Sequence, residues 1–269
     1  MLERQTLALL ARDSGHGLTS LKRLFWGWLA RAPTFQIQSK ERSHLMIDGT
    51  YFSNGLCLVL YYDSDSRYTQ LYRFSHKEDF REMREDLENL RRMRVGVESI
   101  TCDGQRSLLR AVRKVYPGAI LQRCVVHVHR QVCTWLRKNP KSLISIELKE
   151  IVHQLPQIGT HNDRLAWQRD FNDWLERNRE YVYEQSLNEE TGKKWYTHKQ
   201  LHQSASLILG AMPNLFHYLD NAKVPKTTNG LESFFGHLKD NLSIHRGLST
   251  EHRRQFIRWW LHLKNTRRT

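Results

Sequence analysis

The chain has 269 residues, of which 39% are hydrophobic and 10% aromatic, with only 14 Gly and 6 Pro. This length and composition provide for a hydrophobic core, and they exclude collagen-like, low-complexity and wholly disordered proteins. The net charge of +14 favours a polyanionic partner such as nucleic acid. Residues 1–40 carry six basic and two acidic side chains, and residues 241–269 carry seven and one, so the two ends are predicted to contact phosphates.

Targeting signals and membrane spans are not expected. The longest apolar run, residues 55–62, is far too short to cross a bilayer, and the charged residues near the start exclude a signal-peptide pattern. The four cysteines, Cys57, Cys102, Cys124 and Cys133, are expected to be reduced thiols. These features predict a soluble, cytoplasmic protein with no membrane partner.

The first elements in chain order are two amphipathic helices, over residues 3–12 and 19–30. A Gly-containing turn joins them, and Thr19 or Ser20 is the expected N-cap of the second helix. This outline fits a helix-turn-helix, and it fits a simple helical hairpin packed on the core equally well. Residues 31–40 are expected to form a linker.

Residues 44–139 have the pattern of an α/β structure with a mixed sheet. The expected strands and helices alternate as follows: strands 44–52, 56–63 and 67–74 in an antiparallel meander, helix 76–93, strand 97–102, helix 105–116, strand 119–124 and helix 125–137. The strand signal disappears after Pro140. Helices are predicted over residues 141–155, 161–184, 199–220, 229–241 and 250–265.

Three acidic residues are candidates for a metal site. Asp48 and Asp103 each end a hydrophobic strand and precede a glycine, so their carboxylates are expected to converge at one edge of the sheet. Such carboxylates repel one another unless a divalent cation lies between them, and hard oxygen ligands favour Mg²⁺ or Mn²⁺. The alternative is that each Asp-Gly pair is simply a turn.

Glu232 is expected one turn into the helix at 229–241. It is the third candidate acid, although Asn229 as N-cap and Glu232 at the third helical position resemble a capping box. The catalytic and the capping roles can coexist.

Four motifs in order resemble the Mutator-like superfamily of DDE transposases, in its bacterial branch. They are Ile-Asp48-Gly-Thr-Tyr-Phe, Cys-Asp103-Gly, Gln-Arg-Cys124-Val-Val-His127 and Thr-Thr-Asn-Gly-Leu-Glu232-Ser-Phe. The resemblance covers residues 44 to about 250. It implies a ribonuclease H-like mixed sheet flanked by helices, with an all-helical insertion before the last catalytic acid.

The resemblance also implies the activity and the partners. Asp48, Asp103 and Glu232 would be the catalytic acids and would hold two Mg²⁺ or Mn²⁺ ions per active site. The chain would cleave the terminal inverted repeats of its element and transfer the strands to target DNA. A homodimer or larger assembly on double-stranded DNA, associated with the nucleoid, is expected.

The expected domains follow from this assignment. They are a helix-turn-helix-like segment over residues 1–35, the first part of the catalytic core over 41–139, the insertion over 140–226 and the last core helices over 227–269. The N-terminal segment is shorter than a complete DNA-binding region. The alternative function is therefore a truncated or inactive transposase-derived DNA-binding protein or regulator.

Cys124 and His127 match the family's Cys-x2-His signature, which implies a supporting role near the active site. Two alternatives are open. The pair forms half of a zinc site that His129 and Cys133 complete, or it is a buried thiol beside a core histidine.

Several further residues are candidate DNA contacts. Trp135, Trp167, Trp174 and Trp195 are able to stack on bases, but most are expected to be core residues. Trp195, beside Lys193 and Lys194, is the best candidate among them. Arg246 follows the helix of Glu232, and Arg254 and Arg258 share one face of the basic last helix, where backbone phosphate contacts are expected.

Overall fold

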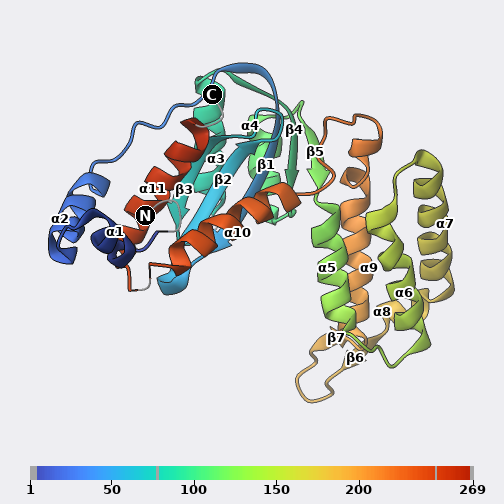
Figure 1. Ribbon diagram of the computed structural model, residues 1–269. Helices are drawn as coiled ribbons and strands as arrows, with labels where there is room; N and C mark the ends of the chain where they lie inside the picture. The colour runs from blue at the N-terminus through green and yellow to red at the C-terminus, as the bar shows by residue number, and fades with distance from the viewer. Residues whose placement is uncertain (1–4, 77–78, 246, 267–269) are drawn as a thin grey trace. The chain divides into compact units, whose positions relative to one another are not determined.

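The computed structural model describes residues 5–76, 79–245 and 247–266, and it is an α/β structure (Figure 1). A mixed five-stranded sheet has the order β3-β2-β1-β4-β5, and two further strands, β6 and β7, form a separate pair. The strands are β1 (Lys40–Tyr51), β2 (Cys57–Asp63), β3 (Tyr68–Ser75), β4 (Val95–Cys102), β5 (Ile120–Arg123), β6 (Gln185–Leu187) and β7 (Lys194–Tyr196). The helices are α1 (Leu7–Ser14), α2 (Leu18–Leu29), α3 (Phe80–Arg92), α4 (Arg106–Val115), α5 (Val125–Leu136), α6 (Leu143–Gln154), α7 (His161–Arg177), α8 (Arg179–Tyr183), α9 (Lys199–Ala211), α10 (Asn229–Ser243) and α11 (Thr250–Thr266).

The chain divides into two compact units. The first comprises residues 1–100, 106–119 and 229–269, and the second comprises residues 101–105 and 120–228. The first unit therefore holds β1 to β3, most of β4, and helices α1 to α4, α10 and α11. The second unit holds β5 and all elements from α5 to α9.

Strands β1, β2 and β3 form the predicted antiparallel meander. Met46 lies opposite Tyr62, and Leu58 lies opposite Phe74. Every residue of β2 is buried, which explains its nearly unbroken hydrophobic sequence. The apolar side chains thus fit the place of β2 between two neighbours, β3 and β1.

Strands β1 and β4 run in the same direction. The Ser39 hydroxyl donates to the Arg94 carbonyl at 3.3 Å, and His44 Nδ1 lies 2.7 Å from Ser99 Oγ. Both pairs are separated by 55 residues, and a constant separation of this kind defines a parallel register. The sheet therefore changes from antiparallel to parallel between β1 and β4.

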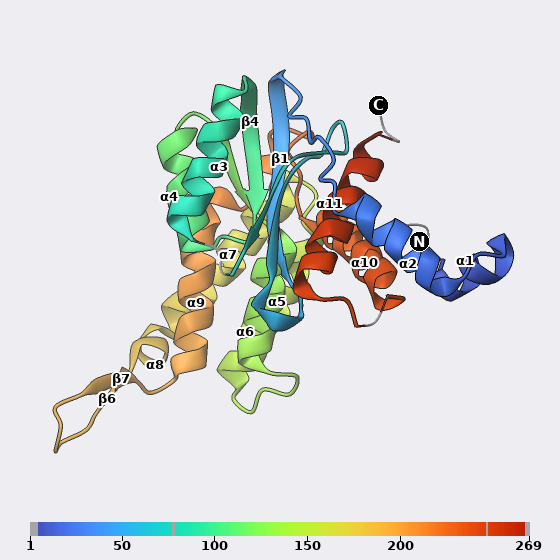
Figure 2. The ribbon, with the colours of Figure 1, turned by 90° about the vertical axis from the view of Figure 1, so that its left-hand side faces the viewer.

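Helices cover both faces of the sheet in the first unit. Figure 2 shows α10 and α11 on one face and α3 and α4 on the other. Phe234, Leu238, Phe256 and Trp260 pack with Leu60 and other residues of the meander in one core. The helix predicted from residue 76 begins at Phe80 instead, because the Asp79 side chain accepts a hydrogen bond from the Arg81 backbone and caps the helix there.

The N-terminal helices pack against the last helix of the same unit. The Trp28 ring stacks on Trp259 with 3.8 Å between ring centroids, and Trp26 stacks on His252 at 4.1 Å. Leu29 is buried in the shared core. The predicted N-cap of α2 is wrong, because Gly17 occupies that position and no side chain caps the helix.

The second unit is built around a helical core. Trp167 and Trp174 are buried in it, and their indole N–H groups donate to the carbonyls of Ile151 and Ile144 at 2.8 and 3.1 Å. The predicted helices are present, but the segment is not all-helical because β6 and β7 pair between α8 and α9. Among the described residues, none of the helices combines the length and apolar character that crossing a membrane requires.

Candidate active site

Asp48 lies within β1 rather than at the end of a strand. β1 continues to Tyr51, and the residues on either side of Asp48 pair with β2. The Asp48 carboxylate accepts a hydrogen bond from the Gly49 backbone at 2.8 Å, and the side chain is half-buried. The interpretation of Asp48-Gly49 as a turn is therefore wrong, because both residues belong to a paired strand.

Glu232 lies in the first turn of α10 and is half-buried. A carboxylate oxygen of Glu232 lies within 4.8 Å of one of Asp48, and both belong to the first unit. Two acids far apart in the sequence are thus brought to one place. Because α10 begins at Asn229, the residue directly before the helix is Thr228 and not Asn229, the N-cap expected from the sequence.

Asp103 lies in the second unit, at the turn that follows β4. Its carboxylate accepts a hydrogen bond from the Gln105 backbone at 2.9 Å, and its carbonyl accepts one from the Arg123 guanidinium at 3.1 Å. Gly104 has φ +91°, and a Cβ there would lie 1.8 Å from the guanidinium of Arg123. At Asp103-Gly104 the Asp-Gly turn does form, and it leaves the carboxylate half-buried.

Arg123, the last residue of β5, contacts this turn and was not predicted from the sequence. The side chain is only 8% exposed, and burial lowers the pKa of its guanidinium despite the opposing influence of Cys102 and Asp103. The only sign of its role in the sequence is its position directly before Cys124 in the Gln-Arg-Cys124-Val-Val-His127 motif. A buried cation beside Asp103 holds the turn in place through its hydrogen bond to the carbonyl.

Cys124 and His127 lie together in the second unit. Cys124 is buried and precedes α5 as its N-cap residue, and its sulfur accepts hydrogen bonds from the backbone N–H and the hydroxyl of Thr228, at 3.3 and 3.5 Å. The Thr228 hydroxyl lies 3.4 Å from His127 Nδ1. Burial alone would raise the pKa of the Cys124 thiol, but hydrogen bonds with His127 and Thr228 lower it below its ordinary value.

The proposed completion of a zinc site around Cys124 does not form. His129 and Cys133 lie instead with His153 of α6, whereas Cys124 and His127 share Thr228. The contact of Thr228 with Cys124 was not predicted, because the motif that contains Thr228 gives no sign of it. His153 was missed because its partners lie on another helix.

We expect the Cys124–His127 pair to support activity without binding zinc. In Cys124→Ser, the shorter side chain moves the acceptor atom away from Thr228 and weakens the hydrogen bond between them. Activity should therefore fall about two- to tenfold, the equivalent of one weakened hydrogen bond. Cleavage rate and elemental analysis of the purified variant check this expectation. Loss of one bound zinc per chain on Cys124→Ser would contradict it.

The candidate DNA contacts at residues 193–195 belong to the β6–β7 hairpin. Trp195 lies in β7 and is 46% exposed, whereas Trp167 and Trp174 are core residues and Trp135 is half-buried. Lys193 and Lys194 are exposed beside it. The indole of Trp195 and the two neighbouring lysines are therefore accessible from solvent.

Arg254 and Arg258 lie on the same face of α11, as predicted. Both are half-buried, and their guanidinium carbons lie 5.9 and 5.8 Å from the centroid of the Phe74 ring. They line an open cavity of about 560 Å³ together with Phe35, Tyr72 and Asp86. Arg246 lies outside the described residues.

Neutralising Arg254 and Arg258 together is expected to weaken binding to specific and random duplexes by similar factors. Each lost phosphate contact reduces the slope of log K against log salt by about one unit. The slope is measured for the wild type and for the Arg254→Gln/Arg258→Gln variant on both duplexes. Arg113→Gln/Lys114→Gln, which removes two exposed charges from α4, is the control. An unchanged slope, or a loss confined to the element's own ends, would contradict the prediction.

Comparisons with known proteins agree on one family. Residues 72–201 match the model described as "Transposase, Mutator family". A curated relative, "Transposase for insertion sequence element IS1201" from Lactobacillus helveticus, is 32% identical over 80 residues, which are 28% of this chain. The match spans 22% of that relative, so the chain matches only about a fifth of its length.

One solved structure that matches the chain is titled "CryoEM structure of simian T-cell lymphotropic virus intasome in complex with PP2A regulatory subunit B56 gamma". The match covers 73% of this chain and 74% of that one, at 12% identity and a TM-score of 0.26. The family match covers two of the four sequence motifs, those of Asp103 and of Cys124 and His127. Residues 72–201 of this chain are thus similar to transposases of the Mutator family.

Proposed function

We propose that this chain is a DNA transposase that cleaves the ends of its element and transfers the strands to target DNA by a DDE mechanism. Asp48 and Glu232 are the first two acids of the site. The observation that carries the proposal is the approach of their carboxylates within 4.8 Å, from a strand and a helix far apart in the sequence. Their meeting in a member of a transposase family supports a shared role.

Asp103 is proposed as the third acid because it lies in the second of the four motifs, at the end of the strand parallel to β1. Residues of β1 lie beside residues 55 positions later in β4, as Ser39 with Arg94 and His44 with Ser99 show. β4 ends at Cys102, and Asp103 follows it directly in the Cys-Asp103-Gly motif.

The donor chemistry of these acids fits a divalent cation. Asp48 and Glu232 offer hard carboxylate oxygens, both half-buried and near each other, which is what Mg²⁺ or Mn²⁺ prefers. Two such ions, when bound by Asp48, Asp103 and Glu232, would stabilise the attacking and the leaving oxygen of an in-line displacement at phosphorus. A ribonuclease H-like core and an insertion before Glu232 are part of the same proposal.

The chain's own residues would bind and orient the DNA. The basic faces near Arg254 and the β6–β7 hairpin would contact backbone phosphates, and Trp195 would stack on an unpaired base. One site is able to serve both steps, since water and then a 3′-hydroxyl attack phosphorus with the same geometry. The partners are the terminal inverted repeats and target DNA, and a dimer or larger assembly would hold two ends together at the nucleoid.

A cleavage assay on a duplex that contains the element's end tests this proposal. We expect nicking that requires Mg²⁺ or Mn²⁺ and that occurs at the end of the repeat, followed by joining to a second duplex. A scrambled duplex of equal length is the control. Binding without any metal-dependent nicking would instead support the alternative, an inactive transposase-derived regulator.

A further inference from the structure

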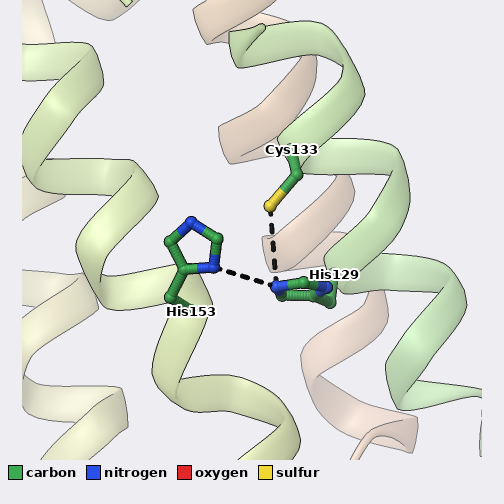
Figure 3. A group of neighbouring side chains, drawn as sticks. All are labelled: His129, Cys133 and His153. Atoms are coloured by element: carbon green, nitrogen blue, oxygen red, sulfur yellow. Dashed lines mark hydrogen bonds between the residues drawn. The ribbon is translucent and has the colours of Figure 1, made fainter. Parts of the chain in front are cut away.

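A second group of potential metal ligands lies in the helical unit, outside the acids proposed for catalysis. Figure 3 shows His129 and Cys133 on α5 facing His153 on α6. Each offers one ligand atom, and these atoms all lie within 4.8 Å of one another. No step of the proposed cleavage reaction uses any of the three.

The helices bring these side chains together for simple geometric reasons. His129 and Cys133 are four residues apart, so they lie on the same face of α5 one turn from each other. The neighbouring positions Val128 and Val132 of α5 and Leu148 and Val152 of α6 are buried in one core. Packing of the two helices through that core therefore sets His153 opposite the His129–Cys133 pair.

The distances match a tetrahedral metal centre. His129 Nε2 lies 3.3 Å from His153 Nδ1 and 3.6 Å from Cys133 Sγ. With zinc bonds of about 2.0–2.1 Å to nitrogen and about 2.3 Å to sulfur, a tetrahedron has N···N edges of about 3.3 Å and N···S edges of about 3.6 Å. Two of the three edges therefore already match one ion, and the third pair, Cys133 and His153, lies within 4.8 Å.

Hydrogen bonding alone satisfies this cluster poorly. His129 Nε2 faces both His153 Nδ1 and Cys133 Sγ, and a ring nitrogen offers either one proton or one lone pair. It can therefore form only one good hydrogen bond with these two neighbours. A cation would accept electron pairs from all three atoms at once.

We propose that His129, Cys133 and His153 form a binding site for a borderline-soft divalent cation, Zn²⁺, with water in the fourth position. Two imidazoles and a thiolate suit zinc and are unsuited to Mg²⁺, so this site differs in chemistry from the carboxylates. Binding releases the thiol proton of Cys133 to solvent and leaves the two imidazoles neutral. His129 and Cys133 are half-buried and His153 is exposed, so the ion can enter from solvent.

The bound ion would cross-link α5 and α6 and so stabilise their packing. The first turn of α5 also carries His127, and Cys124 precedes it, so an ion about one turn further on would fix the helix that presents this pair. This role is independent of the DNA reaction, and its test requires no cleavage activity.

Titration of the full chain with Co²⁺, after treatment with a chelator, tests the site. Co²⁺ replaces Zn²⁺ in such sites, and thiolate coordination gives a charge-transfer band in the near ultraviolet. We expect one equivalent of Co²⁺ to produce this band, Cys133→Ser to abolish it, and His153→Ala to weaken binding at least about tenfold. Cys124→Ser and His161→Ala, a cysteine and an exposed histidine of the same unit, should keep the wild-type affinity.

Thermal unfolding followed by circular dichroism accompanies the titration. Zn²⁺ should raise the Tm of the wild type and of Cys124→Ser, and it should leave the Tm of Cys133→Ser unchanged. A wild type that binds Co²⁺ without a thiolate band, or not at all, would overturn the proposal. So would a band that survives in Cys133→Ser or disappears in Cys124→Ser. Far-ultraviolet spectra show whether each variant is folded, and Cys133→Ala replaces Cys133→Ser if the latter is not.

Discussion

Asp48→Ala, Asp103→Ala and Glu232→Ala are each expected to reduce strand cleavage by at least about a thousandfold, while folding and DNA affinity stay nearly unchanged. Removing one acid removes a ligand on which the stabilisation of the reacting oxygens depends, and each factor of ten in rate corresponds to about 1.4 kcal/mol. Cleavage of an end-containing duplex and binding of the same duplex are measured side by side. Loss of cleavage with intact binding identifies a role in chemistry.

The control lies on the same helix as Glu232. Asp240 is an exposed acid of α10, and Asp240→Ala should cleave at close to the wild-type rate. Glu232→Gln separates catalysis from capping, because the amide keeps an acceptor for a backbone N–H but loses the charge. If Glu232→Ala unfolds the last two helices and retains residual cleavage, capping was the true role of Glu232.

Gly96→Ala is expected to destabilise the first unit by about 3 kcal/mol or more. A Cβ at this position in β4 would lie 2.0 Å from the backbone carbonyl oxygen of Glu41 and 3.3 Å from that of Lys40. Backbone of a paired strand cannot move aside as a flexible side chain does, so the added methyl separates β1 from β4. Urea unfolding of both proteins measures the change in the free energy of unfolding.

Gly118→Ala is the matched control for this substitution. Gly118 belongs to the same unit, and a Cβ there meets nothing within 4 Å. We expect its stability to remain within about 0.5 kcal/mol of the wild type. Equal stability of Gly96→Ala and the wild type would show that β1 and β4 are not packed this closely.

Much of the fold is predictable from the pattern of apolar residues. The meander and the helices between residues 80 and 136 follow from alternation and from three- and four-residue spacing, which burial against a sheet imposes. The β6–β7 hairpin was not predicted, because strands of three residues are too short to show alternation. Asp48 was placed at a strand end because Gly49 suggested a turn, whereas pairing with β2 keeps the strand extended.

The candidate site was predictable in part. Residue types and order predict Asp48, Asp103 and Glu232 as candidate acids, and the structure brings the first and last together in one unit. The environment of Cys124 was not predictable, because Thr228 lies more than a hundred positions further along the chain. His153 was hidden for the same reason, since contact between helices leaves no local trace in the sequence.

The division of the chain into units has a consequence for its synthesis. The second unit is nearly continuous, over residues 120–228, whereas the first needs residues after 229 to cover one face of its sheet. During translation, the sequence of the helical unit is therefore complete before α10 and α11, which cover the meander, have been synthesised. Asp48 emerges early and Glu232 late, so a nascent chain contains no acid pair. Any DNA chemistry that depends on the pair begins only once translation has passed the last helices.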